Sequence, residues 1–204
     1  MAVMAEFPEP ESRRVLTADC RRCSALVEAR ERISWGNGPI DAEVVVVGEA
    51  PAAGDPHAEQ WRGGNLTGMA YTSRHSGRKI RTLLAEADIE SAYYTNAVKC
   101  HPPENRDPTD EELANCRPYL LREIEAVEPA AVLPTGKHAT RTVLALDDRS
   151  LDGFVDTVLE PTRSDALGVR VVPLLHPSYQ DVWLSRLGYS RDEYVAEIAT
   201  VVET

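Results

Sequence analysis

The four cysteines of this chain have the spacing of a metal site. They are Cys20, Cys23, Cys100 and Cys116. The first two have the C-x-x-C spacing. A capping box of Thr109 and Glu112 predicts the start of a helix, and the fourth cysteine lies on that helix, where it can turn back toward Cys100. Paired thiols in an intracellular protein favour a metal over disulfides. Four thiolates suit zinc or an iron–sulfur cluster, which spacing alone does not distinguish, and four unrelated buried cysteines are the remaining alternative.

Three polar residues interrupt or end apolar stretches, and each could do chemistry. Asn96 lies within the β-prone residues 93–98 and offers a donor and an acceptor on one amide, as the reading of a nucleobase edge requires. Glu49 follows the β-branched residues 44–47 and could activate water in a partly apolar cleft. His176, before Pro-Ser, could hydrogen bond or protonate an anionic oxygen. Tyr71, in a Gly-rich loop, could stack on a ring. A capping, core or surface role is the common alternative for each of them.

The elements that must position these residues alternate between strand and helix. Strands are predicted at residues 44–47, 93–98, 130–133 and 169–175, and helices at 76–87, 109–127, 137–146 and 191–202. Residues 13–32 are predicted as a helical region that the first cysteine pair interrupts, residues 48–68 as a long loop, and residues 179–187 as a loop or broken helix. The alternation predicts an α/β fold of three layers, α/β/α, with a four-stranded parallel sheet. We expect a single domain over residues 12–204 after a flexible acidic tail, residues 1–11. Ligands of such sheets bind beyond the carboxyl ends of the strands, where the candidate residues gather.

The charge and hydropathy of the chain indicate where the protein is located and what it can bind. The chain has 204 residues and a net charge of −11, whereas nucleic-acid-binding proteins are usually basic. Its lysines are Lys79, Lys99 and Lys137, and the other basic residues are arginines. Abundant acid with scarce lysine resembles proteins of salt-loving archaea, and an ordinary acidic cytosolic protein explains the charge equally well. No apolar run is long enough to span a bilayer, and no signal peptide is evident. We therefore expect a cytoplasmic protein of a prokaryote, with no membrane partner.

Several motifs together resemble the uracil-DNA glycosylase superfamily, and most of all its iron–sulfur members, families 4 and 5. Residues 95–100 (TNAVKC), 102–109 (PPENRDPT) and 116–120 (CRPYL) resemble family 4, as do residues 48–51 (GEAP). Family 4 continues that motif with Gly, whereas Ala52 stands here, as in family 5. The loop of residues 64–77 resembles family 5, which has Phe at the position of Tyr71 and Asp at that of Arg74. Residues 176–178 (HPS) match both. The histidine-bearing loop by which one related branch traps DNA covalently is not evident after Lys99.

The resemblance implies a function and a set of site residues. It implies a [4Fe-4S] cluster on the four cysteines and the hydrolysis of the N-glycosidic bond of uracil flipped out of single- or double-stranded DNA, with other deaminated bases as further candidate substrates. Glu49 would position or activate water, Asn96 would read the pyrimidine edge, and His176 would stabilise charge on uracil O2. Tyr71 would stack on the base. Further pocket residues would be Gly48, Ala50, Pro51, Ala52 and Ser178.

Two other functions are compatible with parts of the sequence. The first is a non-catalytic iron–sulfur protein of the same fold that binds damaged DNA or nucleotides, for which Glu49 is the discriminating feature because a pure binder needs no water-activating carboxylate. The second is a generic nucleotide-binding domain, which the absence of Gly-x-Gly-x-x-Gly after the first strand disfavours. We expect the protein to be a monomer.

Overall fold

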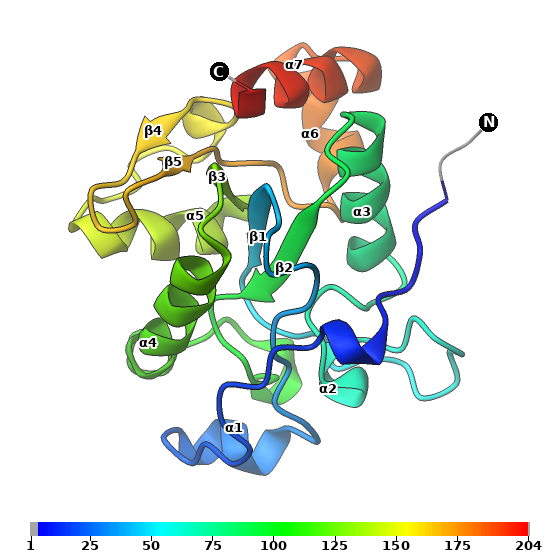
Figure 1. Ribbon diagram of the computed structural model, residues 1–204, viewed down its shortest axis with the longest axis vertical. Helices are drawn as coiled ribbons and strands as arrows, with labels where there is room; N and C mark the ends of the chain where they lie inside the picture. Colours follow the sequence, from blue (N-terminus) through cyan, green and yellow to red (C-terminus); the bar gives the residue numbers. More distant parts are fainter. Residues whose placement is uncertain (1–3, 204) are drawn as a thin grey trace.

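The computed structural model describes residues 4–203, in which helices and strands alternate along the chain (Figure 1). The strands are β1 (Val44–Gly48), β2 (Ala92–Asn96), β3 (Ala131–Pro134), β4 (Thr162–Arg163) and β5 (Arg170–Val171). The α-helices are α1 (Ser24–Ala29), α2 (Gly64–Thr67), α3 (Ser76–Glu86), α4 (Asp110–Val127), α5 (Gly136–Leu144), α6 (Gln180–Leu187) and α7 (Arg191–Glu203). Short 3-10 turns are η1 (Pro10–Ser12), η2 (Pro103–Asn105), η3 (Ala145–Asp147) and η4 (Val155–Thr157).

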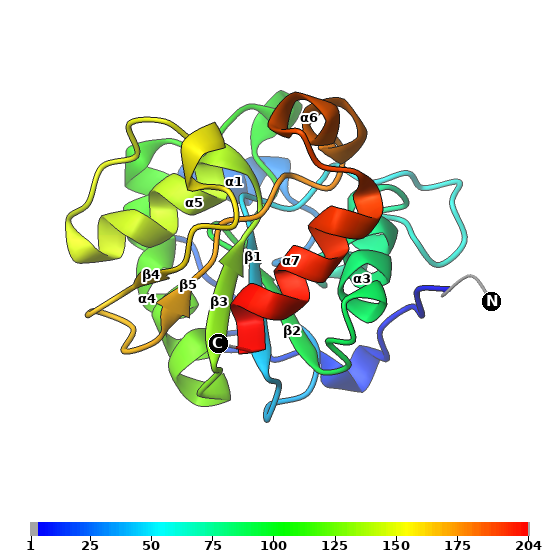
Figure 2. The same cartoon turned by 90° about the horizontal axis from the view of Figure 1, so that it is seen from above.

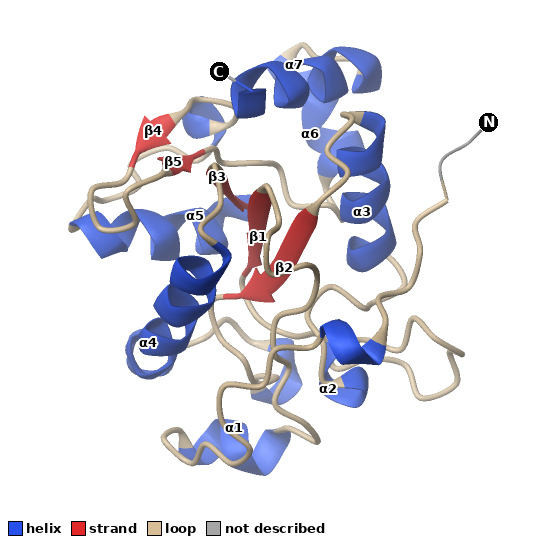
Figure 3. Cartoon of the chain, viewed as in Figure 1, coloured by secondary structure: helices blue, strands red, loops and turns tan. Residues whose placement is uncertain are grey.

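The sheet corrects the prediction of four parallel strands. It has five strands in the order β2-β1-β3-β5-β4, and the fifth, β4, pairs antiparallel with β5 (Figure 3). The four predicted strands are present and parallel to one another. The last is shorter than predicted, because Pro173 has no N–H to donate and the pairing beyond it continues only as an isolated bridge between Leu174 and Thr135. The α/β class is confirmed.

Helices cover both faces of the sheet and bury its β-branched strands. On one face Val44 and Val46 pack with α3, α6 and α7, and on the other Val45 and Val47 pack with α4 and α5. Seen from above, the strands run between these two groups of helices (Figure 2). Strand β1 is fully buried because it is covered from both sides, which explains its uninterrupted run of valines.

The predicted helical region at residues 13–32 is wrong except for α1. Helix α1 begins only after Cys23, which precedes it in an extended conformation. Upstream, the Arg13 side chain donates to the carbonyl oxygens of Gly68 at 2.5 Å and Ile33 at 2.7 Å. Because of these contacts with distant residues, residues 13–23 have no regular secondary structure. In Figure 1 they lead down to α1 at the lower end of the molecule. Nearby, Phe7 packs edge-on against Trp61, with ring centroids 5.0 Å apart.

The register of the sheet brings the predicted site residues to one edge. Gly48 pairs with Asn96, and Val47 pairs with both Thr95 and Pro134. The parallel strands therefore end at the same level, and the loops that follow them meet there. Among residues 4–203, no helix is both long and apolar enough to cross a membrane.

Candidate active site and cysteine cluster

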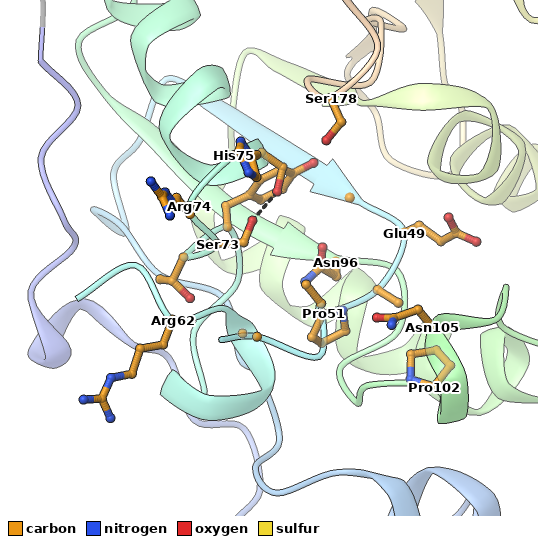
Figure 4. A pocket seen from close by; sticks show the side chains of 18 of the residues that line it. Glu49, Pro51, Arg62, Ser73, Arg74, His75, Asn96, Pro102, Asn105 and Ser178 are labelled. Carbon is orange, nitrogen blue, oxygen red and sulfur yellow. Dashed lines mark hydrogen bonds between the residues drawn. The ribbon is translucent and has the colours of Figure 1, made fainter. Parts of the chain in front are cut away.

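A pocket of about 500 Å³ opens at the carboxyl edge of the sheet. This volume lies within the range of roughly 300 to 1,000 Å³ that is usual for small-molecule sites. Every pocket residue expected from the sequence lines it: Gly48, Glu49, Ala50, Pro51, Ala52, Tyr71, Asn96, His176 and Ser178. Figure 4 shows Asn96 near the middle of this group, with Glu49 on one side and Arg62, Arg74 and His75 on the other.

Gly48 allows two side chains to meet at the base of the pocket. A Cβ atom added at Gly48 would overlap the Asn96 side-chain oxygen and would lie 2.8 Å from the hydroxyl oxygen of Tyr71. No side chain larger than hydrogen fits there without moving one of them. The glycine is needed for close approach, since its backbone belongs to an ordinary strand.

Tyr71 is held rigidly, with only 8% of its surface exposed. Its hydroxyl shares a 2.5 Å hydrogen bond with the hydroxyl of Thr135, and its ring meets that of Tyr94 edge-on at 5.9 Å. The residue has φ of 50°, a left-handed conformation that is uncommon outside glycine, and tight packing must maintain it. Tyr71 thus forms a fixed wall of the pocket, and burial raises the pKa of its hydroxyl.

Asn96 is fixed from behind by a buried ion pair. The ammonium of Lys99 donates to the backbone carbonyl of Asn96 at 2.6 Å, and it also contacts the carboxylate of Glu123 at 2.6 Å. Lys99 and Glu123 are 1% and 0% exposed, respectively, so this pair is shielded from water. The side-chain amide of Asn96 has no hydrogen-bond partner among residues 4–203 and lines the pocket, where it can bind a ligand.

His176 has a defined tautomer. The backbone N–H of Ser178 donates to its Nδ1 at 3.2 Å, so Nδ1 must carry a lone pair, and the proton of a neutral ring is on Nε2. Burial, reinforced by the nearby His138, lowers the pKa of His176 and favours that neutral ring. Gly136, with φ of 83°, packs against it, because a Cβ there would lie 3.0 Å from the His176 Cβ. The side chain can therefore donate one hydrogen bond from Nε2.

Glu49 has a carboxylate that water reaches only partly. Its side chain is 28% exposed, and its Oε1 atom is buried without a hydrogen-bond partner. The carboxylate points away from Asn96 in Figure 4. Burial raises the pKa of Glu49, the facing His138 opposes that rise, and Asp107 adds to it. A carboxylate with a raised pKa is suited to accept a proton from water near neutral pH.

The four cysteines converge in a small lobe around α1, apart from the main core. Cys100 and Cys116 are buried and Cys20 and Cys23 are partly exposed, and all pack with apolar residues that include Trp35 and Tyr119. None of them forms a disulfide in the part of the chain described. Burial raises the pKa of the Cys100 thiol and raises that of Cys116 to about 11.

Donor groups point at these sulfur atoms. The Arg30 guanidinium donates to Cys100 Sγ at 3.0 Å, and the Asn115 amide donates to Cys23 Sγ at 3.4 Å. Such donors suit thiolates, whereas burial raises the pKa of the Cys23 and Cys100 thiols and favours their neutral form. A bound metal resolves this conflict because it deprotonates the thiols that coordinate it. The chemistry of the four side chains, which lie in one cluster with donors facing two of the sulfur atoms, suits a metal centre.

Comparison with known proteins identifies the family. Residues 35–200 match the family model described as "Uracil DNA glycosylase superfamily". The chain belongs to this superfamily. It is 34% identical to the type-5 uracil-DNA glycosylase of Pyrobaculum aerophilum over 83% of this chain and 82% of that protein. It is 33% identical to the type-4 uracil-DNA glycosylase of Archaeoglobus fulgidus over 78% and 76%, and 32% identical to the type-4 enzyme of Thermotoga maritima over 85% of each.

These near-equal identities agree with the mixture of family 4 and family 5 motifs in the sequence. Arg74 lines the pocket with Arg62 and His75. Basic side chains thus line one side of the pocket.

Two residues near Glu49 were missed by the sequence analysis. His138 lies in the first turn of α5, and Asp107 lies in the loop before α4. The side-chain nitrogen and oxygen atoms of Glu49, Asp107 and His138 come within 4.8 Å of one another. The signal available was that α5 begins directly after β3, so a histidine in its first turn must lie at the same edge of the sheet as Glu49.

Proposed function

We propose that this protein removes uracil from DNA by hydrolysing its N-glycosidic bond. The observation that carries the proposal is the arrangement of Glu49, Asn96 and His176 around one pocket in a chain of the uracil DNA glycosylase superfamily. A base inside a duplex cannot enter such a pocket. It must be flipped out, which costs a few kcal/mol and is easiest at a mismatch such as U·G or in a single strand.

Asn96 recognises the base in this proposal. Its amide can donate to uracil O4 and accept from N3–H, a combination that cytosine does not offer. The buried Lys99 holds the backbone of Asn96 in place, so the amide is preorganised for one orientation of the base. Tyr71, fixed through Thr135, provides a wall on which the flipped ring stacks.

His176 and Glu49 act on the bond that breaks. As the bond loosens, negative charge develops on uracil and positive charge on the sugar. The Nε2–H of neutral His176 donates to uracil O2 and stabilises the departing anion without having to transfer its proton. The Glu49 carboxylate stabilises the positively charged sugar and orients the water that attacks it.

We further propose that Cys20, Cys23, Cys100 and Cys116 hold a [4Fe-4S] cluster. The cluster would have a structural role. Its four Fe–S bonds would tie the N-terminal segment to the loop after β2 and to helix α4. Purified anaerobically, the protein should be brown and contain about four irons and four sulfides per chain. A colourless, folded protein with one zinc per chain would refute the cluster.

The activity is tested by uracil release from oligonucleotides that carry one uracil, in single-stranded, U·G and U·A forms, at low and high salt. We expect excision from all three, fastest from single-stranded and U·G substrates because the base is unpaired or weakly paired. A matched oligonucleotide with thymine is the control. Tight binding of the uracil strand without release of the base would instead indicate a non-catalytic member of the superfamily.

We propose that the protein is cytoplasmic and monomeric, and light scattering at two ionic strengths would test the monomer.

A further inference from the structure

Glu49, His138 and Asp107 form a line of ionisable groups beside the pocket. The Nδ1 atom of His138 lies 3.6 Å from Oε1 of Glu49, and its Nε2 atom lies 3.5 Å from Oδ2 of Asp107. The imidazole thus bridges two carboxylates that come from different loops. The buried Oε1 of Glu49, which has no hydrogen-bond partner, is the atom that faces the ring.

His138 lies beside the pocket and is not part of its wall. Glu49 and Asp107 belong to the pocket wall. Its ring can therefore touch Glu49 without touching a bound base. The ring is 38% exposed and can exchange a proton with solvent. A role in chemistry would have to be exerted through a neighbouring pocket residue, and Glu49 is the one that the ring faces at 3.6 Å.

The groups around Glu49 have opposite effects on the pKa of its carboxyl group. Burial raises the pKa of Glu49 and the negative charge of Asp107 raises it further, whereas His138 and, more weakly, Arg141 lower it. Arg141 is itself 3.8 Å from Asp110, which faces it from the start of α4. His138 also lowers the pKa of a second pocket residue, His176. Among these groups, the imidazole of His138, which is a cation only when it is protonated, lies nearest to the Glu49 carboxylate.

We propose that His138 is a positioning residue that bridges Glu49 to Asp107 and keeps the Glu49 carboxylate ionised and fixed in the active site. The inference rests on the proposed function, because it concerns the carboxylate that acts on the sugar and water. Protonated His138 favours ionised Glu49, so the active form persists to lower pH than burial alone would allow.

The test replaces His138 in two opposite ways. His138→Gln keeps a hydrogen-bond donor and removes the cation, so the pKa of Glu49 should rise and the acid limb of the pH–rate profile should move to higher pH. His138→Arg makes the cation permanent and should move the limb to lower pH. On the acid limb of the profile, the single-turnover rate changes about tenfold per pH unit. His138→Gln should therefore lose activity several-fold near pH 5 and little near pH 8.

Single-turnover rates between about pH 5 and 9 supply the profiles, with His57→Gln as the control. His57 is an exposed histidine outside the pocket wall, and its removal should leave the profile unchanged. If both His138 variants lower the rate equally at every pH, the residue is merely structural and the proposal is wrong.

A second measurement separates this inference from the proposed function. The carbon-13 shift of the Glu49 carboxyl reports its ionisation directly, whether or not the protein releases uracil. We expect its titration to move to higher pH in His138→Gln and to lower pH in His138→Arg. An unchanged titration would overturn the inference even in an active enzyme, and a wild-type protein that releases no uracil would overturn the function whatever the titration shows.

Discussion

Asn96 joins a donor and an acceptor on one side chain, and its surroundings leave both unused. Changing it to Asp alters only that chemistry. An ionised Asp can accept but not donate, so O4 of uracil would lose its donor, while the amino group of cytosine would gain an acceptor. We expect Asn96→Asp to lose uracil excision at about pH 8, with any residual activity shifted toward cytosine.

Asn105→Asp is the matched control for that variant. Asn105 lines the same pocket, and its side-chain oxygen accepts from the backbone N–H of Ala53 at 3.3 Å, which a carboxylate can also do. It should retain uracil excision. Wild-type rates on uracil from Asn96→Asp would show that β2 does not read the base.

Glu49 is expected to act in the transition state rather than in binding. Glu49→Gln keeps the shape of the side chain and removes its charge and basicity, so the single-turnover rate of uracil release should fall by roughly 10²- to 10⁴-fold. The dissociation constant for uracil-containing DNA should change little. Glu104→Gln, at an exposed glutamate of the η2 turn, is the control and should be fully active. Unchanged cleavage by Glu49→Gln would remove this residue from the mechanism.

At the scale of elements, the end of β2 depends on an ion pair between Lys99 and a glutamate of α4. Lys99→Met would leave Glu123 buried and unpaired, although Glu123 would still accept from the backbone of Gly36 at 2.9 Å. Removing one partner of a buried pair costs about 3 to 5 kcal/mol of unfolding free energy. We expect such a loss in urea unfolding of Lys99→Met.

The double variant Lys99→Met, Glu123→Met distinguishes an unpaired charge from a general packing defect. It removes both charges, so most of the stability should return. If the double variant is less stable than Lys99→Met, the unpaired carboxylate is not the cause of the loss.

The elements that the sequence predicted well are those whose signals are local. Helix α4 begins after Thr109 because the side chains and backbone of Thr109 and Glu112 bond reciprocally, at 3.2 and 2.9 Å, as the capping box predicts. Strand β1 follows from its run of valines. Residues 13–23 were mispredicted because contacts with residues far along the chain, such as the bond from Arg13 to Gly68, override local preference. Strand β4 is only two residues long and carries no periodic signal.

In the candidate site, too, residues with a local sequence signal could be predicted, and features set by distant contacts could not. Glu49 and Asn96 could be placed at the pocket from the sequence because each stands at the end of a strand, and His176 because it follows the predicted strand at residues 169–175. His138 could not be chosen from its neighbours in sequence, since its importance comes from its distance to Glu49 and Asp107. The strained φ of Tyr71 and the tautomer of His176 also follow from three-dimensional contacts and have no sequence signal.

At the scale of the whole molecule, an acidic protein must approach a polyanion. The net charge of −11 opposes this approach, while Arg62 and Arg74 lie at the pocket and Arg78 follows on α3. We expect Arg74→Ala to weaken binding of uracil-containing DNA and to lower the slope of log K against log salt by about 0.7 to 0.9, the value of one phosphate contact. The single-turnover rate with saturating enzyme should be unchanged.

Arg163→Ala is the control for this charge effect. Arg163 is an exposed arginine of β4, at the edge strand of the sheet, and it is not part of the pocket wall. Its removal changes the net charge by the same amount but should leave the salt slope as it is. Equal slopes for Arg74→Ala and the wild type would exclude a phosphate contact at Arg74.

The gathering of every cysteine in one lobe also gives the protein a chemical signature. The chain has four cysteines and no others, so an occupied site leaves no free thiol anywhere in the molecule. Iodoacetamide reacts with thiolates that are not held by metal, and the partly exposed Cys20 and Cys23 would be alkylated first once the site is lost. Mass spectrometry of a briefly alkylated sample would therefore count intact and damaged molecules separately, without a measurement of colour or activity.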